Sequence, residues 1–245
     1  MRTRVSLGWC AMVAAAVLLA SPVFAQLEEV VVTASRYVDR YGDFVVPHVS
    51  IKKRPDFAVA DLKVESDTRD LAGRRRELMQ TLTELGRRAA TNGAVTVALL
   101  EESEDKNGET RVKPYSIGVA EAAIHNGSRP DTSRVAVLLR TAVKADDTIN
   151  SVQERLDAFV NTLPKPGRVS LVVDDIELTL VKPSQYRADV INAIGQDAKT
   201  IVAALGPGQA VELEGLENQI AWRRTGDLEL TVFLPHRLKV VPAGR

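Results

Sequence analysis

The sequence predicts an α+β fold, in which antiparallel sheet is covered on one face by three amphipathic helices. Three segments repeat apolar residues at the helical spacing, and shorter segments between them alternate apolar and polar residues. Alternation of this kind suits antiparallel sheets with one solvated face. The same segments lack the continuous apolar runs that are typical of a fully buried parallel sheet.

Residues 1–25 have the layout of a secretory signal peptide. Arg2 and Arg4 precede an uncharged stretch from Leu7 to Ala20, and Ala25 supplies a small residue at the expected cleavage site. This stretch is shorter than the roughly 20 residues that a membrane span needs, so we expect cleavage rather than a retained anchor. The segment therefore predicts a periplasmic protein without a transmembrane span once it is removed.

Composition excludes several classes of protein. The chain has 245 residues, with 32 basic and 32 acidic side chains, and removal of residues 1–25 leaves 30 basic and 32 acidic ones. This balance argues against a nucleic-acid-binding protein. The single cysteine, Cys10, lies in the signal segment, so a disulfide scaffold and a multi-cysteine zinc site are both excluded. With 45% apolar and 26% charged residues, the chain has the composition of a soluble globular protein.

The next segment, residues 26–47, is expected to be an extended N-terminal strand and linker. Its β-branched run favours an extended backbone. The segment resembles the TonB box of TonB-dependent outer-membrane receptors, a strand that pairs with a sheet edge of the energy-coupling protein. The resemblance implies a partner-binding strand made of Glu28, Glu29, Val30, Val31, Val32, Thr33 and Ala34.

A complete TonB-dependent receptor is nevertheless excluded by the length of the chain. Such a receptor needs a plug and a closed barrel, and the rest of the chain is too short for both. Aromatic residues make up 4% of the chain, too few for the girdles of a barrel. Two interpretations stay open: a TonB-contacting strand on a small periplasmic protein associated with the outer membrane, or a β-segment that matches by chance.

The first part of the body is predicted from its periodicity and its turn signals. Between Phe57 and Glu65 every second residue is apolar, which indicates a strand with one buried face. The helix that follows has cap candidates at residues 67–70 and a stop signal at Asn92-Gly93. The predicted elements are a strand starting near His48, a strand at 57–65, a helix at 71–90, a strand at 94–100 and its partner at 111–119, joined by a charged turn.

The second part follows the same logic after a loop near residues 125–133, which is a candidate boundary between two subdomains. Asp146 to Thr148 offer caps for a helix, and Pro183-Ser184 opens another. The predicted elements are a strand at 133–143, a helix at 149–163, strands at 169–173 and 176–181, a helix at 183–205, a strand near 211–216 and a final strand at 228–234 extended to 241.

Several of these segments together resemble the SIMPL domain family of secreted or periplasmic bacterial proteins. The opening Arg54-Pro55-Asp56-Phe57-Ala58, the alanine-containing helix that ends at Leu205-Gly206 and the strand at 228–234 carry the resemblance, which spans residues 48–242. It implies a periplasmic envelope protein. Some members are linked to stress tolerance, surface antigenicity or ring-like assemblies. It implies no enzymatic activity and assigns no catalytic residue.

Residues 1–245 contain no motif that predicts catalysis or cofactor binding. A G-x-S-x-G nucleophile turn, a P-loop and a G-x-G-x-x-G dinucleotide motif are all absent from the sequence. His48, His125 and His236 lie far apart in the sequence, and none has a second ligand type at metal spacing. We therefore expect no catalytic, cofactor-binding or metal-binding residues.

Four charged clusters have both a functional and a structural interpretation. Arg74 to Arg76 could contact an anion such as a lipid phosphate, Asp174-Asp175 and residues 101–105 could attract calcium, and Trp222 with its neighbouring arginines could contact glycan or lipid. Solvated faces and turns are the ordinary roles of such residues, and we favour them here.

The resulting expectation is a non-enzymatic periplasmic protein that acts as an interaction or assembly module. Its partners would be envelope proteins, either TonB or further copies of itself. The alternatives are an accessory of TonB-dependent transport that docks through residues 27–36, and an enzyme with an unrecognised site.

Overall fold

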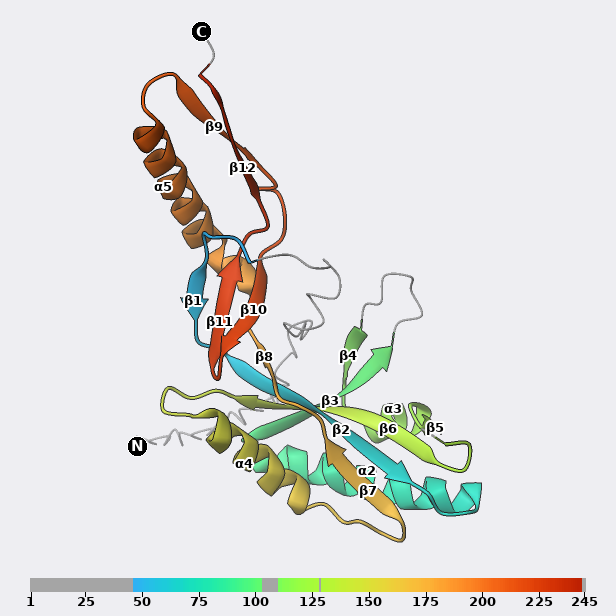
Figure 1. Ribbon diagram of the computed structural model, residues 1–245. Helices are drawn as coiled ribbons and strands as arrows, with labels where there is room; N and C mark the ends of the chain where they lie inside the picture. The colour runs from blue at the N-terminus through green and yellow to red at the C-terminus, as the bar shows by residue number, and fades with distance from the viewer. Residues whose placement is uncertain (1–45, 103–109, 128, 244–245) are drawn as a thin grey trace, which may run out of the picture.

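The computed structural model describes residues 46–102, 110–127 and 129–243, and it has the predicted α+β fold (Figure 1). Helices and antiparallel strands each make up a large share of the described residues. In chain order the elements are β1 (Ile51–Lys53), β2 (Phe57–Ser66), α2 (Leu71–Asn92), β3 (Val95–Glu102), β4 (Thr110–Pro114), α3 (Ile117–Ala122), β5 (His125–Asn126), β6 (Ser133–Ala142), α4 (Ile149–Asn161), β7 (Val169–Val173), β8 (Glu177–Thr179), the 3₁₀ turn η1 (Pro183–Tyr186), α5 (Arg187–Leu205), β9 (Gln209–Glu214), β10 (Ala221–Gly226), β11 (Glu229–Phe233) and β12 (Arg237–Pro242).

A seven-stranded antiparallel sheet forms the larger part of the molecule. Its two longest strands, β2 and β6, pair over their full ten residues, from Phe57 opposite Ala142 to Ser66 opposite Ser133. On the far side of β6 lie β3 and then β4, while β7 and β8 both pair with β2. The short β5 pairs with the beginning of β6.

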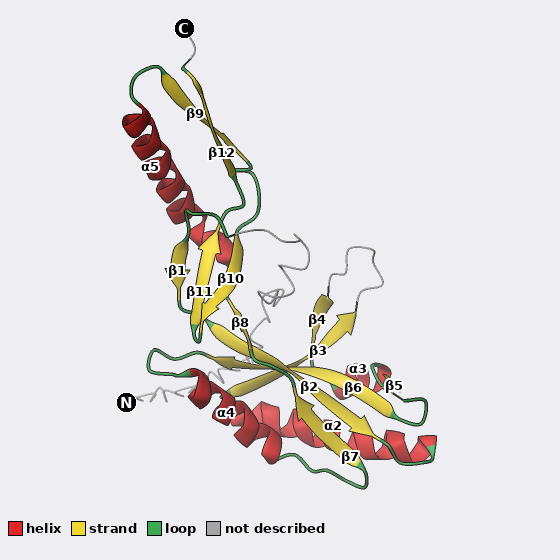
Figure 2. Ribbon diagram, viewed as in Figure 1, coloured by secondary structure: helices red, strands yellow, loops and turns green. Residues whose placement is uncertain are grey.

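One face of this sheet is covered by α2 and α4, and the main core lies between the two layers (Figure 2). The alternating face predicted for β2 is buried as expected, with exposed fractions of 0–2% for its four apolar side chains. Both helices bury an apolar stripe against it, because their apolar residues recur at the helical spacing. The residues of this interface are Ala58, Ala60, Leu62, Val64, Leu78, Leu82, Leu85, Val152, Leu156 and Phe159.

The beginning of both helices and the end of α2 are fixed by residues that the sequence suggested, whereas α4 ends at Asn161 rather than at residue 163. Asp70 caps α2 by accepting a hydrogen bond from the Gly73 N–H at 2.6 Å, and Gly93 ends the helix in the left-handed conformation at φ 68°. Thr148 and Ser151 form a reciprocal capping box at the start of α4.

The stretch expected to be a strand at 111–119 is shorter in the structure, because a fourth helix begins within it. β4 ends at Pro114, and the side chain of Ser116 then caps α3 by accepting a hydrogen bond from the Val119 N–H. Tyr115 anchors this corner, since its hydroxyl donates to the Leu82 carbonyl of α2 at 2.5 Å. The sequence contained the cap residue, but the alternation of residues 111–114 concealed the change of structure.

The remaining strands form two smaller sheets. β11 lies between β1 and β10 in a three-stranded antiparallel sheet, and β9 pairs with β12 in a two-stranded sheet that we call the ribbon. Figure 2 shows the ribbon and α5 at the end of the molecule opposite α2 and α4. The buried core is nevertheless continuous, because Val190, Leu230 and Val232 belong to the same cluster as Leu62 and Leu78.

α5 buries less of its predicted apolar stripe than α2 and α4 do. Only Val190 and Ile194, near its beginning, are fully buried. The later residues Ile201 and Val202 are half-buried and Leu205 is exposed, because the strand that contacts α5 belongs to the narrow two-stranded ribbon. Apolar residues at the helical spacing predict which side of a helix packs against the rest of the fold. They do not predict how much surface the neighbouring elements offer to that side.

The final strand, predicted to run from 228 to 241, is two strands in different sheets. β11 ends at Phe233 and β12 begins at Arg237, and the bend between them is held by hydrogen bonds. Asn218 Nδ2 donates to the Pro235 carbonyl at 2.8 Å, and Nδ1 of His236 donates to the Leu234 carbonyl at 2.8 Å. The chain therefore leaves the three-stranded sheet and enters the ribbon.

Two further expectations concern the subdomain boundary and a membrane-spanning helix. Near the suggested subdomain boundary, His125 and Asn126 of β5 pair with Arg134 and Ser133 of β6 in the seven-stranded sheet. Across residues 46–102, 110–127 and 129–243, we find no helix with both the length and the apolarity needed to cross a membrane.

Candidate interaction surface

The residues proposed from the TonB-box resemblance, Glu28 to Ala34, lie outside the described residues, as do the expected signal peptide and most of the linker. The structure therefore leaves the expected docking strand as a prediction. The surfaces that can be judged are those of residues 46–243, apart from residues 103–109 and 128.

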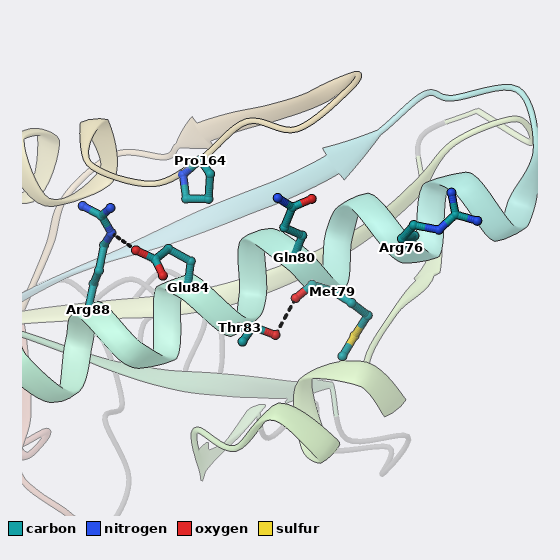
Figure 3. Close-up of a pocket in the computed structure, with 7 residues that line it drawn as sticks. All are labelled: Arg76, Met79, Gln80, Thr83, Glu84, Arg88 and Pro164. Atoms are coloured by element: carbon teal, nitrogen blue, oxygen red, sulfur yellow. Dashed lines mark hydrogen bonds and ion pairs between the residues drawn. The ribbon is translucent and has the colours of Figure 1, made fainter.

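A depression on the outer side of α2 brings polar side chains together, but its chemistry is that of a satisfied ion pair. Figure 3 shows it between α2 and Pro164, with Glu84 held by Arg88 at 2.6 Å. Arg87 also donates to Glu84, at 2.7 Å. Burial opposes the charge of Glu84, but these hydrogen bonds outweigh it and lower the pKa of Glu84 to about 2. A carboxylate held this firmly ionised is a poor general base.

The three histidines are partly brought together. His48 and His236 line one pocket with Asp197, although they come from opposite ends of the folded chain. His125 lies elsewhere, where its Nε2 accepts a hydrogen bond from Arg134 Nε at 3.1 Å. Among the described residues, no group of three or more histidine, cysteine or acidic side chains is placed to hold a metal ion.

The charged clusters singled out in the sequence have structural contacts where they are described. Asp174 forms an ion pair with Lys63 at 2.7 Å, beside the β2–β7 pairing. Arg74 is buried and donates to Ser133 and to the carbonyls of residues 68 and 69, so it ties α2 to the sheet. Trp222 is buried within β10. Asp174 thus has the ordinary surface role that we favoured, whereas Arg74 and Trp222 are buried structural residues rather than parts of a solvated face or a turn.

The ribbon is different, because its strands pair only with each other in the described part of the chain. β9 and β12 are antiparallel and in register over six residues, from Gln209 opposite Pro242 to Glu214 opposite Arg237. Each strand therefore has an outer edge whose backbone N–H and C=O groups pair with no described strand. Edges of this kind are templates for pairing with another chain, and proteins usually protect them.

The two faces of the ribbon have opposite character. Because side chains alternate along a strand, Val211 and Leu213 share one face with Leu238 and Val240. The other face carries four charged side chains, all of them exposed. α5 packs against β9 and lies on the apolar face, since three of the four apolar residues there are half-buried. Val240 of β12 remains 42% exposed on that face.

Charge is divided between the two strands of the ribbon. Glu212 and Glu214 lie on β9, while Arg237 and Lys239 lie on β12. Each acidic residue faces a basic one across the ribbon, Glu212 opposite Lys239 and Glu214 opposite Arg237. One outer edge of the ribbon is consequently acidic and the other is basic.

The sequence carries part of the signal for this surface. Both strands alternate apolar and charged residues, and one of them has only acidic charges while the other has only basic ones. Periodicity predicted a strand near 211–216 and a final strand at 228–234 extended to 241. It did not predict that they would pair with each other and leave both outer edges unpaired by the described strands.

Comparisons of the chain with models of known families, with curated proteins and with solved structures found no match.

Proposed function

We propose that the chain is a non-enzymatic interaction module of the periplasm, resembling SIMPL-domain proteins, which binds protein partners by strand addition at the ribbon. The observation that carries this proposal is the pair of outer edges of β9 and β12, which pair with no other described strand. Strand addition to an exposed edge is a common mode of peptide and protein recognition, in which backbone hydrogen bonds supply affinity and side chains supply specificity.

The chemistry of two of the described pockets supports a binding role over an enzymatic one. In the pocket of Figure 3, the one carboxylate is held by two arginines, and no cysteine or histidine lies beside it. The pocket with His48 and His236 contains no serine, threonine or cysteine that either imidazole could activate. The expected signal peptide at residues 1–25 supports the periplasmic location.

Site-specific photo-crosslinking in living cells tests the proposal. A photoreactive amino acid at Lys239, on the ribbon, is compared with one at Glu154, which is exposed on α4 at the other end of the molecule. We expect discrete crosslinked products from position 239 that are absent from position 154. Identical patterns of products at the two positions would contradict a binding role for the ribbon.

The alternative proposal, an accessory of TonB-dependent transport, has a separate test. It depends on residues 27–36 rather than on the ribbon, so their deletion should abolish binding to the C-terminal domain of TonB. Unchanged binding after that deletion would rule the alternative out. The crosslinks at position 239 should be unaffected by the deletion if the ribbon is the binding surface.

A further inference from the structure

We propose that the partner of the ribbon is a second copy of this chain, with β9 of one copy pairing antiparallel with β12 of the next. This inference rests on the proposed function and names the partner of the same surface. It is carried by three features of the ribbon: its charges, its uncovered apolar residue and its two outer edges, which pair with no described strand.

The charges favour a β9–β12 contact between copies over a contact between like strands. Within one copy, Glu212 lies opposite Lys239 and Glu214 opposite Arg237. The same register between copies would repeat this pattern on the outer edges. Two β9 strands would instead bring four glutamates to one face, and two β12 strands would bring four cations. Like charges across a strand pair are destabilising, so the unlike contact is preferred.

The apolar face supports the same arrangement. Inside one copy Val240 lies opposite Val211, but α5 sits over β9 and leaves Val240 and Leu205 exposed, at 42% and 52%. A second copy's β12 added to the outer edge of β9 would place that copy's Val240 beside Val211, on the face that α5 covers. Apolar surface that is exposed in the single chain would then be removed from water.

The two outer edges, free of any strand in the described part of the chain, determine the kind of assembly. A β9–β12 contact is heterologous, because the two copies contribute different surfaces. After one contact forms, the pair still presents one acidic edge and one basic edge. Further copies add until the rotation between neighbours closes a ring, or they continue as an open chain.

Cysteine crosslinking tests the contact directly, since the only cysteine of the chain is Cys10 in the expected signal segment. One preparation of the chain carries Val211→Cys and another carries Val240→Cys. Opposed residues in an antiparallel pair bring their Cβ atoms about 4.5–5.5 Å apart, which is close to disulfide geometry. We expect disulfide-linked pairs when the two preparations are mixed under mild oxidation, and none from either preparation alone. Disulfide pairs within a single preparation would indicate like-strand contacts and overturn the proposal.

Charge reversal provides the second test, with light scattering after size-exclusion chromatography as the measurement. The wild-type mass should rise with concentration and fall with added salt, because the charges are exposed. Glu212→Lys with Glu214→Lys makes both strands basic and should weaken association at least about tenfold. Reversal of Arg237 and Lys239 to glutamate in the same chain restores opposite edges and should restore association. Circular dichroism shows whether each variant is folded.

The outcomes separate this inference from the function on which it rests. A folded wild-type chain that stays monomeric at every concentration overturns the inference. If position 239 still crosslinks to another envelope protein in cells, the proposed function stands without it. If position 239 gives the same pattern as position 154, both fail.

Discussion

Glu77 of α2 accepts hydrogen bonds from the hydroxyl of Ser66, at the end of β2, at 2.7 Å and from that of Thr68 at 2.8 Å. The backbone N–H of Arg168 donates to the same carboxylate at 3.3 Å. Ser66 is fully buried, so its hydroxyl depends on this contact. One side chain thus joins α2 to the ends of two neighbouring strands of the seven-stranded sheet.

Replacement of Glu77 by glutamine should destabilise the fold. The amide would turn a donor toward hydroxyls that donate to the carboxylate, and a buried polar group left unsatisfied costs about 1–3 kcal/mol. Urea unfolding followed by the fluorescence of the buried Trp222 measures the change. Glu154→Gln on the exposed side of α4 is the matched control and should have little effect. Equal stability of the two variants would contradict this role for Glu77.

Gly167 should tolerate alanine less well than Gly93 does. Both have positive φ, 56° and 68°, so alanine at either position carries the strain of the left-handed conformation, about 1–2 kcal/mol. A Cβ at Gly167 would also meet Oε1 of Glu77 at 2.1 Å, whereas a Cβ at Gly93 would meet nothing within 4 Å. Unfolding in urea should show Gly167→Ala to be the less stable variant. In a Glu77→Ala background, the additional loss of stability in Gly167→Ala relative to Gly93→Ala should vanish.

Stability should fall in acid, in part because of Asp147. Burial opposes its charge, but hydrogen bonds from Arg155, from the backbone of Lys144 and from Ser151 lower the pKa of Asp147 below its ordinary value. The folded state therefore binds fewer protons than the unfolded one. The stabilisation is complete above about pH 4 and is lost as the pH falls through the folded pKa.

Arg155→Gln tests this relationship. Arg155 approaches Asp147 at 2.5 Å in a largely buried pair, and hydrogen bonds to charged groups contribute about 1.5–3 kcal/mol. The variant should be less stable at pH 7, and its stability should depend less steeply on pH between 4 and 2. Urea unfolding across that range measures both effects. An unchanged pH dependence would contradict the assignment.

Glu84 should titrate near pH 2, because Arg87 and Arg88 both donate to its carboxylate. Carbon-detected NMR of the carboxyl groups would show Glu84 still ionised well below the ordinary glutamate pKa of about 4.3. In an Arg87→Gln, Arg88→Gln variant the pKa of Glu84 should rise toward its ordinary value of about 4.3. An ordinary pKa for Glu84 in the wild-type protein would show that, in solution, the two arginines do not stabilise its ionised carboxylate.

Local patterns in the sequence predicted most elements, and long-range pairing explains several of the differences. The period of β2 and the caps of α2 and α4 depend on residues close in the chain, so they could be recognised directly. The division at Pro235-His236 and the pairing of β9 with β12 depend on contacts between distant strands. Alternation indicates a strand but does not identify its neighbour.

The candidate site shows the same limit. Residues 28–34 could be proposed from the sequence because their pattern is contiguous, and they remain a prediction outside the described part of the chain. Glu212 and Lys239 acquire meaning only when the register places them opposite each other. Nothing in either strand alone distinguishes these side chains from an ordinary solvated face.

The pairing of β1 with β11 has a consequence for the order in which the protein folds. Ile51 pairs with Val232, so the three-stranded sheet closes around everything between them, including all seven strands of the large sheet. That closure has a high entropic cost and needs the end of the chain to be present. We therefore expect the seven-stranded sheet to assemble first, as an insertion that can fold early. The joining of β1 to β11, which brings α5 and the ribbon into place, would be the last and slowest step.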